Sequence, residues 1–181
     1  MTDVQKPYEM ITDYITGKAV PNVGAEENRQ TVERFLVERL GYPAGAVQVD
    51  WPLAFEIDGE HHRSLIDLVV SFGDRPVMAI RCAAGSLESW ARGILAAARV
   101  AEDPPIPLAV VSDGRDAVIF ESASGKKIGK GCQALPSHAG AQDVLLRHRP
   151  QSLGKDRIRR ERLILRTYDA DLVNIRSNLQ K

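Results

Sequence analysis

The clearest pattern of hydrophobic and polar positions lies between residues 47 and 57, where the two kinds alternate. Apolar side chains occupy every second position, namely Val47, Val49, Trp51, Leu53, Phe55 and Ile57. Side chains on a β-strand point alternately to the two faces of a sheet, so this period of two predicts a half-buried strand. Pro52 falls within the run, and because proline donates no backbone hydrogen bond, the strand is expected at a sheet edge or at a bulge.

Further elements follow from the same kind of pattern. Strands are predicted over residues 63–72, 76–82, 108–114 and 115–122, and helices over 8–15, 25–40, 86–101, 137–148 and 156–170. The runs at 76–82 and 108–114 are mostly apolar, as in strands that are buried on both faces. Because a helix separates these two runs, we expect a parallel crossover between them. The predicted fold class is therefore α/β, with a mixed β-sheet flanked by helices.

Composition excludes several classes of protein. The chain has 181 residues, of which 44% are hydrophobic and 27% charged, an ordinary globular composition that excludes a wholly disordered chain. No apolar run approaches the roughly 18 residues of a membrane helix, so no membrane partner is expected. The first ten residues contain no signal-peptide core, and the two cysteines form neither a disulfide framework nor a zinc pattern. The expected location is the cytoplasm.

Charge is balanced overall but unevenly distributed. The chain has 24 basic and 24 acidic residues, yet residues 1–60 are mainly acidic and residues 147–181 mainly basic. The two ends can be faces that meet, or the basic tail can bind phosphate, or it can be a solvated basic helix. Residues 155–166 also carry too many apolar side chains for a free phosphate-binding helix. We therefore expect this segment to pack on the domain or on a second subunit.

These patterns divide the chain into three parts. Residues 1–24 are predicted to form an N-terminal helix and loop, and residues 25–135 an α/β core. Residues 136–181 are predicted to form a basic, helical C-terminal appendage. No internal repeat or low-complexity segment interrupts this division.

Several segments, taken in order, resemble a known family. They are DYITGKAVPNVGAEENRQTVERFLVERLGYP, IDLVV, RPVMAIRCAA and IPLAVVSDGRDAVIFESASGKKIG. Together they resemble the N-terminal domain of type I restriction enzyme R subunits, and more closely small stand-alone proteins built on that domain. The resemblance covers about residues 8–130 and also the ERLILRTYD segment near the end. The order of helix, three strands, helix and strand is that of the PD-(D/E)XK nucleases. The resemblance therefore implies a restriction-endonuclease-like αβββαβ core with C-terminal helices.

The resemblance also implies a hydrolytic site, and this chain departs from it. Active members bind Mg²⁺ through a carboxylate that ends the second strand and another on the third, with a lysine two residues further on. By resemblance, Asp67 is the strand aspartate, and Glu26 is the glutamate that often joins the site from the first helix. Where active relatives read I-E-C-K-A on the third strand, this chain reads I-R-C-A-A over residues 80–84. Arg81 thus replaces the metal-binding glutamate, and Ala83 replaces the lysine.

The exchange of glutamate for Arg81 has a large electrostatic consequence. Two unit charges about 4 Å apart interact by roughly 4 kcal/mol at an effective dielectric constant of about 20. A guanidinium beside a divalent cation therefore removes that attraction and adds a comparable repulsion. We expect Arg81 to pair with Asp67 and Glu26, and the site to be catalytically degenerate. No cofactor is expected, and Asp67 and Glu26 would bind Mg²⁺ only if activity survives.

The predicted role of such a degenerate nuclease domain is DNA binding or docking to a partner. Candidate nucleic-acid contacts are the basic side chains of Arg29, Arg81, Lys126, Lys127 and Lys130, the last three in a glycine-rich hairpin.

Two alternatives remain at this point. One is an active Mg²⁺-dependent DNA endonuclease with an altered site, to which Glu88 on the next helix could supply an acid, although no lysine occurs between Lys18 and Lys126. The other is a structural homodimer, in which the basic tail of one subunit packs on the acidic front of its twin.

Overall fold

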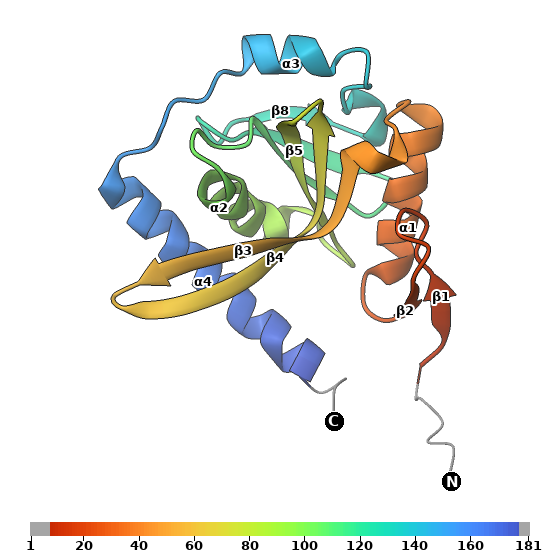
Figure 1. Ribbon diagram of the computed structural model, residues 1–181, viewed down its shortest axis with the longest axis horizontal. Coiled ribbons are helices and arrows are strands. Elements are labelled where there is room, and N and C mark those ends of the chain that lie inside the picture. The colour runs from red at the N-terminus through yellow and green to blue at the C-terminus, as the bar shows by residue number, and fades with distance from the viewer. Residues whose placement is uncertain (1–7, 178–181) are drawn as a thin grey trace, which may run out of the picture.

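The computed structural model describes residues 8–177, and its centre is a six-stranded mixed sheet (Figure 1). The strands are β3 (Val47–Ile57), β4 (Glu60–Phe72), β5 (Arg75–Cys82), β6 (Leu108–Ser112), β7 (Ala117–Glu121) and β8 (Lys127–Lys130). They lie in the sheet in the order of the chain, from β3 at one edge to β8 at the other. Only the neighbours β5 and β6 are parallel. The predicted α/β class with a mixed sheet is confirmed.

The crossover between the parallel strands is made by α2 (Ala91–Ala101), which follows a 3₁₀ turn, Glu88–Trp90. Small side chains at residues 96–98 of this helix are almost fully buried, so α2 lies close to the sheet. The helix ends before Pro104 and Pro105, which cannot continue a helical hydrogen-bond ladder.

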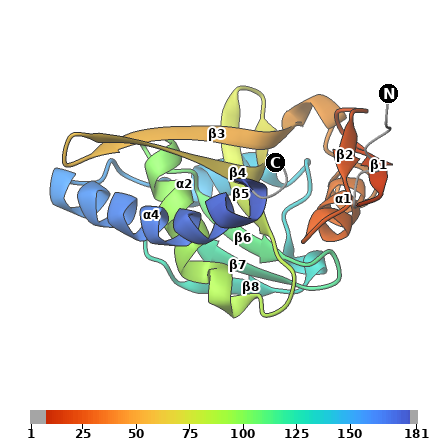
Figure 2. The ribbon, with the colours of Figure 1, turned by 90° about the horizontal axis from the view of Figure 1, so that it is seen from below.

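Helices cover both faces of the sheet, and each face has its own hydrophobic core. One face is covered by α1 (Glu26–Arg34), by its π-helical continuation (Phe35–Arg39) and by α3 (Ala141–Arg147). The core on this face includes Val32, Leu36 and Leu145 from the helices and Leu68 and Ile80 from the strands. On the other face lie α2 and α4 (Lys155–Ser177), whose core includes Ile94, Leu95, Leu165, Val69 and Ala79. Figure 2 shows α4 running alongside β3 and α2.

The strands β3 and β4 form a hairpin that extends well beyond the other strands (Figure 1). Asp58 and Gly59 form its two-residue turn, and both have positive φ angles, 54° and 85°. This conformation matches the right-handed twist of a tight hairpin and is favoured by an Asp-Gly pair. Pro52 lies in β3, the edge strand, as its missing donor predicted.

Residues 10–21 form a second, small hairpin, so the helix predicted over residues 8–15 is wrong. Strand β1 (Met10–Thr12) pairs antiparallel with β2 (Ala19–Pro21). Between them, the Asp13 carboxylate accepts hydrogen bonds from the backbone N–H and the hydroxyl of Thr16, at 2.7 and 2.8 Å. Gly17 follows with a φ of 68°. A side-chain-stabilised turn with a left-handed residue has replaced the expected helix.

The basic C-terminal segment packs on its own domain, which was one of the two expected arrangements. Arg99 of α2 donates a hydrogen bond to Glu161 of α4 at 2.9 Å, and both side chains are nearly buried. Arg159 pairs with Asp58 at the tip of the long hairpin, also at 2.9 Å. The acidic front and the basic tail therefore meet within one chain at this point. No helix among the described residues is long and apolar enough to cross a membrane.

Candidate functional site

Asp67 and Arg81 lie side by side on the neighbouring strands β4 and β5. The Nη1 atom of Arg81 is 3.3 Å from Oδ1 of Asp67, so the structure contains the ion pair expected between them. The other carboxylate oxygen accepts the backbone N–H of Cys82 at 2.8 Å. The guanidinium also lies over the indole ring of Trp90, with Cζ 4.5 Å from the ring centroid. A carboxylate and an aromatic face together hold Arg81 in place.

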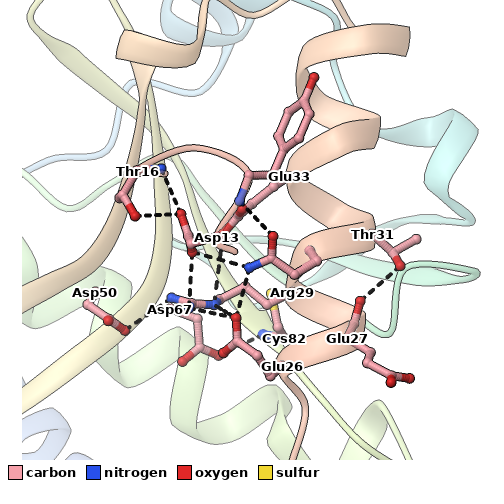
Figure 3. A network of polar contacts seen from close by, with 12 residues as sticks. Asp13, Thr16, Glu26, Glu27, Arg29, Thr31, Glu33, Asp50, Asp67 and Cys82 are labelled. Carbon is pink, nitrogen blue, oxygen red and sulfur yellow. Dashed lines mark hydrogen bonds and ion pairs between the residues drawn. The ribbon is translucent and has the colours of Figure 1, made fainter. Parts of the chain in front are cut away.

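Arg29 of α1 lies close by, surrounded by four carboxylates (Figure 3). Its Nη2 atom is 2.7 Å from Glu26 and 3.2 Å from Asp13. Its Nε atom is 3.8 Å from Glu33, and its Nη1 atom is 3.5 Å from Asp50. Glu26 therefore pairs with Arg29, one helical turn away. The expected pair between Glu26 and Arg81 is not formed, which corrects that part of the prediction.

Gln30 connects this cluster to the N-terminal hairpin. Its amide nitrogen donates to Glu26 at 2.8 Å and to Asp13 at 3.2 Å. Its amide oxygen accepts the backbone N–H of Tyr14 at 2.7 Å. Asp13 and Gln30 were not predicted as site residues, because the segment around Asp13 was expected to be helical. The available signal was the Asp-x-x-Thr-Gly pattern of a side-chain-capped turn.

Asp50 adds a carboxylate from the edge strand β3. The positions on either side of it, Val49 and Trp51, pair with Leu68 and Ile66, so Asp50 lies beside Asp67. Its φ angle is 52°, in the left-handed region that aspartate tolerates better than most residues. Such backbone outliers cluster at functional sites. Asp50 was not among the site residues predicted from the sequence.

Glu33 is the most deeply buried carboxyl group of the cluster, with 0% exposure. Burial raises its pKa to about 7, and the nearby Asp13 carboxylate acts in the same direction, while Arg29 opposes both. Burial would also raise the pKa of Asp13, but the hydrogen bonds from Thr16 bring it below its ordinary value. The two carboxyl groups thus titrate at different pH values, although they face the same guanidinium.

The basic and thiol groups of the cluster have clear charge states. Burial alone would lower the pKa of Arg29, but the hydrogen bond and charge of Glu26 raise it, so the guanidinium stays charged. Burial raises the pKa of the Cys82 thiol well above its ordinary value. Cys82 is therefore a neutral core residue without the thiolate that a nucleophile needs.

These residues do not fit the divalent cation that a PD-(D/E)XK site requires. Asp67 and Glu26 each have a guanidinium within 3.3 Å. The resemblance puts Arg81 at the position of the third-strand carboxylate, and Ala83, at the position that it gives to the lysine, is 1% exposed. The part of the chain that the structure describes contains no group of three or more His, Cys, Asp or Glu residues that could hold a metal ion. Glu88 lies outside the cluster, with a 79% exposed side chain 3.7 Å from Lys127.

The basic residues expected to contact nucleic acid differ in how far their side chains are exposed. Lys126, Lys127 and Lys130 are exposed on the β7–β8 hairpin, at the sheet edge opposite β3. The side chain of Arg81 is 15% exposed. Arg29, by contrast, is only 8% exposed and is enclosed by carboxylates. Its charge is neutralised by carboxylates of the same chain, so we withdraw Arg29 as a DNA contact.

Comparison with known proteins gives one family. The family model described as Type I restriction enzyme R protein N terminus (HSDR_N) matches residues 24–136. The chain belongs to this family. The resemblance inferred from the sequence is therefore confirmed, and the match contains α1, the sheet and the Asp67–Arg81 pair. No curated protein and no solved structure matches the chain.

Some of the described elements lie outside the residues that match the restriction enzyme R N-terminal family. The first hairpin, β1 and β2, and the helix α4 lie outside the matched residues. The hairpin contacts the cluster around Arg29, and α4 lies beside the Asp67–Arg81 pair. Asp13 of the hairpin reaches Arg29, and Leu165 and Tyr168 of α4 line a pocket that also contains Asp67 and Arg81.

Proposed function

We propose that this member of the R N-terminal family is a degenerate nuclease domain that binds DNA and does not hydrolyse it. The observation that carries the proposal is the contact between Arg81 and Asp67. Hydrolysis in this fold needs a cation at that carboxylate, and the guanidinium places a competing positive charge there. The missing third-strand acid and the buried Ala83 support the same conclusion.

DNA contact is assigned to the exposed lysines and not to the cluster around Arg29. The cluster contains the carboxyl groups of Asp13, Glu26, Glu33, Asp50 and Asp67 but only two guanidinium groups. Its excess of acidic groups disfavours phosphate. Lys126, Lys127 and Lys130 instead form an exposed basic hairpin on which a phosphate backbone can lie.

Duplex DNA titrations at several salt concentrations test this role. Binding is expected at low salt, with the logarithm of the association constant falling linearly with the logarithm of salt concentration. Replacing Lys126, Lys127 and Lys130 together with Gln should weaken binding and reduce the salt slope by about one per lost phosphate contact. The matched control replaces Lys155, Arg160 and Arg166 of α4 with Gln, which removes the same charge from another exposed surface.

Absence of binding at low salt would contradict the DNA role. A chain that then sedimented as a stable dimer would favour the structural homodimer instead. Equal losses of DNA affinity in the two triple variants would show that binding depends on the net charge of the protein and not on the β7–β8 hairpin.

An active endonuclease with an altered Mg²⁺ site is the second candidate, and the position of Asp50 beside Asp67 favours it. Calorimetric titration with Mg²⁺ and Mn²⁺, and a plasmid cleavage assay beside Asp67→Ala, decide between the two. We expect no metal binding and no cleavage by the natural chain, whereas Arg81→Glu should gain measurable Mg²⁺ affinity, with Arg81→Gln as its control. Micromolar binding of Mg²⁺ by the natural chain, with cleavage lost in Asp67→Ala, would reverse the proposal.

A further inference from the structure

The N-terminal hairpin, β1 and β2, is held on α1 by the residues of its turn. Asp13 is the only buried residue among residues 10–21, all of which the structure describes. Its carboxylate lies 3.2 Å from Nη2 of Arg29 and accepts a hydrogen bond from Gln30, also at 3.2 Å. Ile15 adds a half-buried contact with the core on that face. A segment with so few buried contacts can open locally while the rest of a protein stays folded.

Asp13 shares the guanidinium of Arg29 with a second buried carboxyl group (Figure 3). Glu33 lies one turn further along α1, and its Oε1 atom is 3.8 Å from Nε of Arg29. The hairpin therefore supplies one carboxyl group and the helix the other, with one positive charge between them. Glu26 and Asp50 place two more carboxylates around the same guanidinium. Like charges in a buried site oppose each other, so one of these groups is expected to retain a proton near neutral pH.

Glu33 is the group that retains the proton. Burial and the charge of Asp13 raise its pKa to about 7, and Glu26 acts in the same direction. Arg29 and the backbone N–H of Ile15 lower the pKa, but by less. Burial would also raise the pKa of Asp13, but the hydrogen bonds to its carboxylate bring it below its ordinary value. Asp13 therefore stays charged between pH 5 and 8, where Glu33 changes its charge.

The other ionisable groups near Glu33 do not account for a change in this range. Cys82 faces it from β5, and burial raises the pKa of this thiol well above its ordinary value. Asp67, next to Cys82, is paired with Arg81. The four histidines lie in other parts of the molecule, near the tip of the β3–β4 hairpin (His61 and His62) and on either side of α3 (His138 and His148).

We propose that Asp13, Arg29 and Glu33 form a proton-linked latch, which holds the N-terminal hairpin on α1 and loosens when Glu33 becomes charged. The hairpin acts on Glu33 in two ways, and the repulsion from Asp13 is stronger than the hydrogen bond from Ile15. Docking of the hairpin therefore favours the protonated form of Glu33. By linkage, the proton favours docking to the same extent. This inference goes beyond the proposed DNA role and does not depend on it.

The direction of the pH dependence follows from the same linkage. With the hairpin docked, Glu33 holds its proton up to a pKa of about 7, whereas a fully solvated carboxyl group would have a pKa of 4.5. The latch is therefore strongest below pH 4.5, weakens as the pH rises toward 7, and changes little above that. Over this range the opening equilibrium can rise by at most about 300-fold, the factor that corresponds to the difference between the two pKa values.

Amide hydrogen exchange, followed by mass spectrometry of peptides between pH 5 and 8, tests the latch. After correction for the chemical exchange rate at each pH, the opening of residues 10–21 should rise about tenfold or more from pH 5 to 7 and then level off. Glu33→Gln cannot lose a proton, so its opening should change by less than about twofold over the same range. Glu56→Gln, at an exposed position on β3, is the control and should keep the rise.

Asp13→Asn is the second variant, and it decides the question if Glu33→Gln does not fold. It removes the charge that faces Glu33 but keeps an oxygen that can accept the hydrogen bonds of Thr16. The rise between pH 5 and 7 should therefore become several-fold smaller, and an undiminished rise would contradict the latch. An opening that does not depend on pH in the natural chain, or that increases on acidification, would overturn it. A rise that persists in Glu33→Gln would assign the effect to the histidines, with the same consequence. The DNA titrations are unaffected by any of these outcomes.

Discussion

Arg29 and Arg99 are both buried arginines on helices, yet their surroundings differ in charge. Arg99 lies between α2 and α4, where its Nη1 atom is 2.9 Å from Glu161, and its Nε atom donates to the carbonyl of Ser122. One buried carboxylate thus faces one buried guanidinium, and the half-exposed Arg92 lies 4.0 Å from the same carboxylate. Arg29 faces four carboxyl groups within 4 Å, and the Asp67–Arg81 pair lies beside them.

The difference separates an ion pair between two helices from a cluster with surplus carboxyl groups. A buried pair with matched charges fixes how two helices meet, and it needs no further partner. An excess of buried carboxyl groups is costly unless something neutralises them, and here a proton on Glu33 can do so, because its pKa is about 7.

The largest expected loss of unfolding free energy comes from breaking the buried Arg99–Glu161 pair. Glu161→Gln leaves the charge of Arg99 buried without its counter-ion, and breaking such a pair costs about 3–5 kcal/mol. Urea unfolding followed by circular dichroism measures the loss. Arg159→Gln is the matched control, because its pair with Asp58 is about 60% exposed and should contribute at most about 1 kcal/mol. Equal losses in the two variants would show that burial of the pair is unimportant.

The second expected effect is a pH dependence that comes from Glu33. Its pKa is raised from 4.5 when unfolded to about 7 when folded, so the folded chain holds the proton more tightly. The contribution of Glu33 to the free energy of unfolding is therefore greatest below pH 4.5. This contribution falls by up to about 3 kcal/mol as the pH rises through 7.

Glu33→Gln should remove that decline and stabilise the protein at pH 8, as measured by urea unfolding at several pH values. Glu56→Gln, at an exposed position on β3, serves as the control and should leave the decline in place. A variant Glu33→Gln that is less stable than the natural chain at pH 8 would show that the charged carboxylate is needed by Arg29.

The smallest expected effect is the removal of one carboxylate from Arg29. Glu26→Gln keeps an oxygen that can accept the hydrogen bond of Arg29, and Asp13, Glu33 and Asp50 remain around the guanidinium. We expect a change of at most about 1 kcal/mol in unfolding free energy. The charge of Glu26 also raises the pKa of Glu33, so the decline in stability should move to lower pH. A loss of unfolding free energy as large as that of Glu161→Gln would show that Arg29 and Arg99 depend equally on a single carboxylate.

The regular elements were predictable because each rests on a local pattern. The alternation over residues 47–57 and the apolar runs at 76–82 and 108–114 became β3, β5 and β6, since a buried face leaves a periodic trace in the sequence. The helix predicted at residues 8–15 failed, because the turn there is made by the side chain of Asp13, which overrides a weak helical pattern.

The candidate site was predictable only in part. The resemblance suggested Asp67, Glu26 and Arg81 as site positions, and charge complementarity correctly paired Arg81 with Asp67. It wrongly paired Glu26 with Arg81, because the sequence did not reveal that Arg29, one turn along the same helix, would be the nearer partner.

By itself, the sequence determined the α/β class, the order of the core elements and the family, because these depend on residue type and local spacing. Only the tertiary structure decided which charges meet. Asp13, Arg29 and Asp50 come from separate elements, and folding joins them in one ion-pair cluster. Arg81 and Tyr168 are far apart in the chain, and folding brings them to one pocket. Electrostatic interactions and stacking depend on distances of a few ångströms, and such distances between remote residues are set by packing.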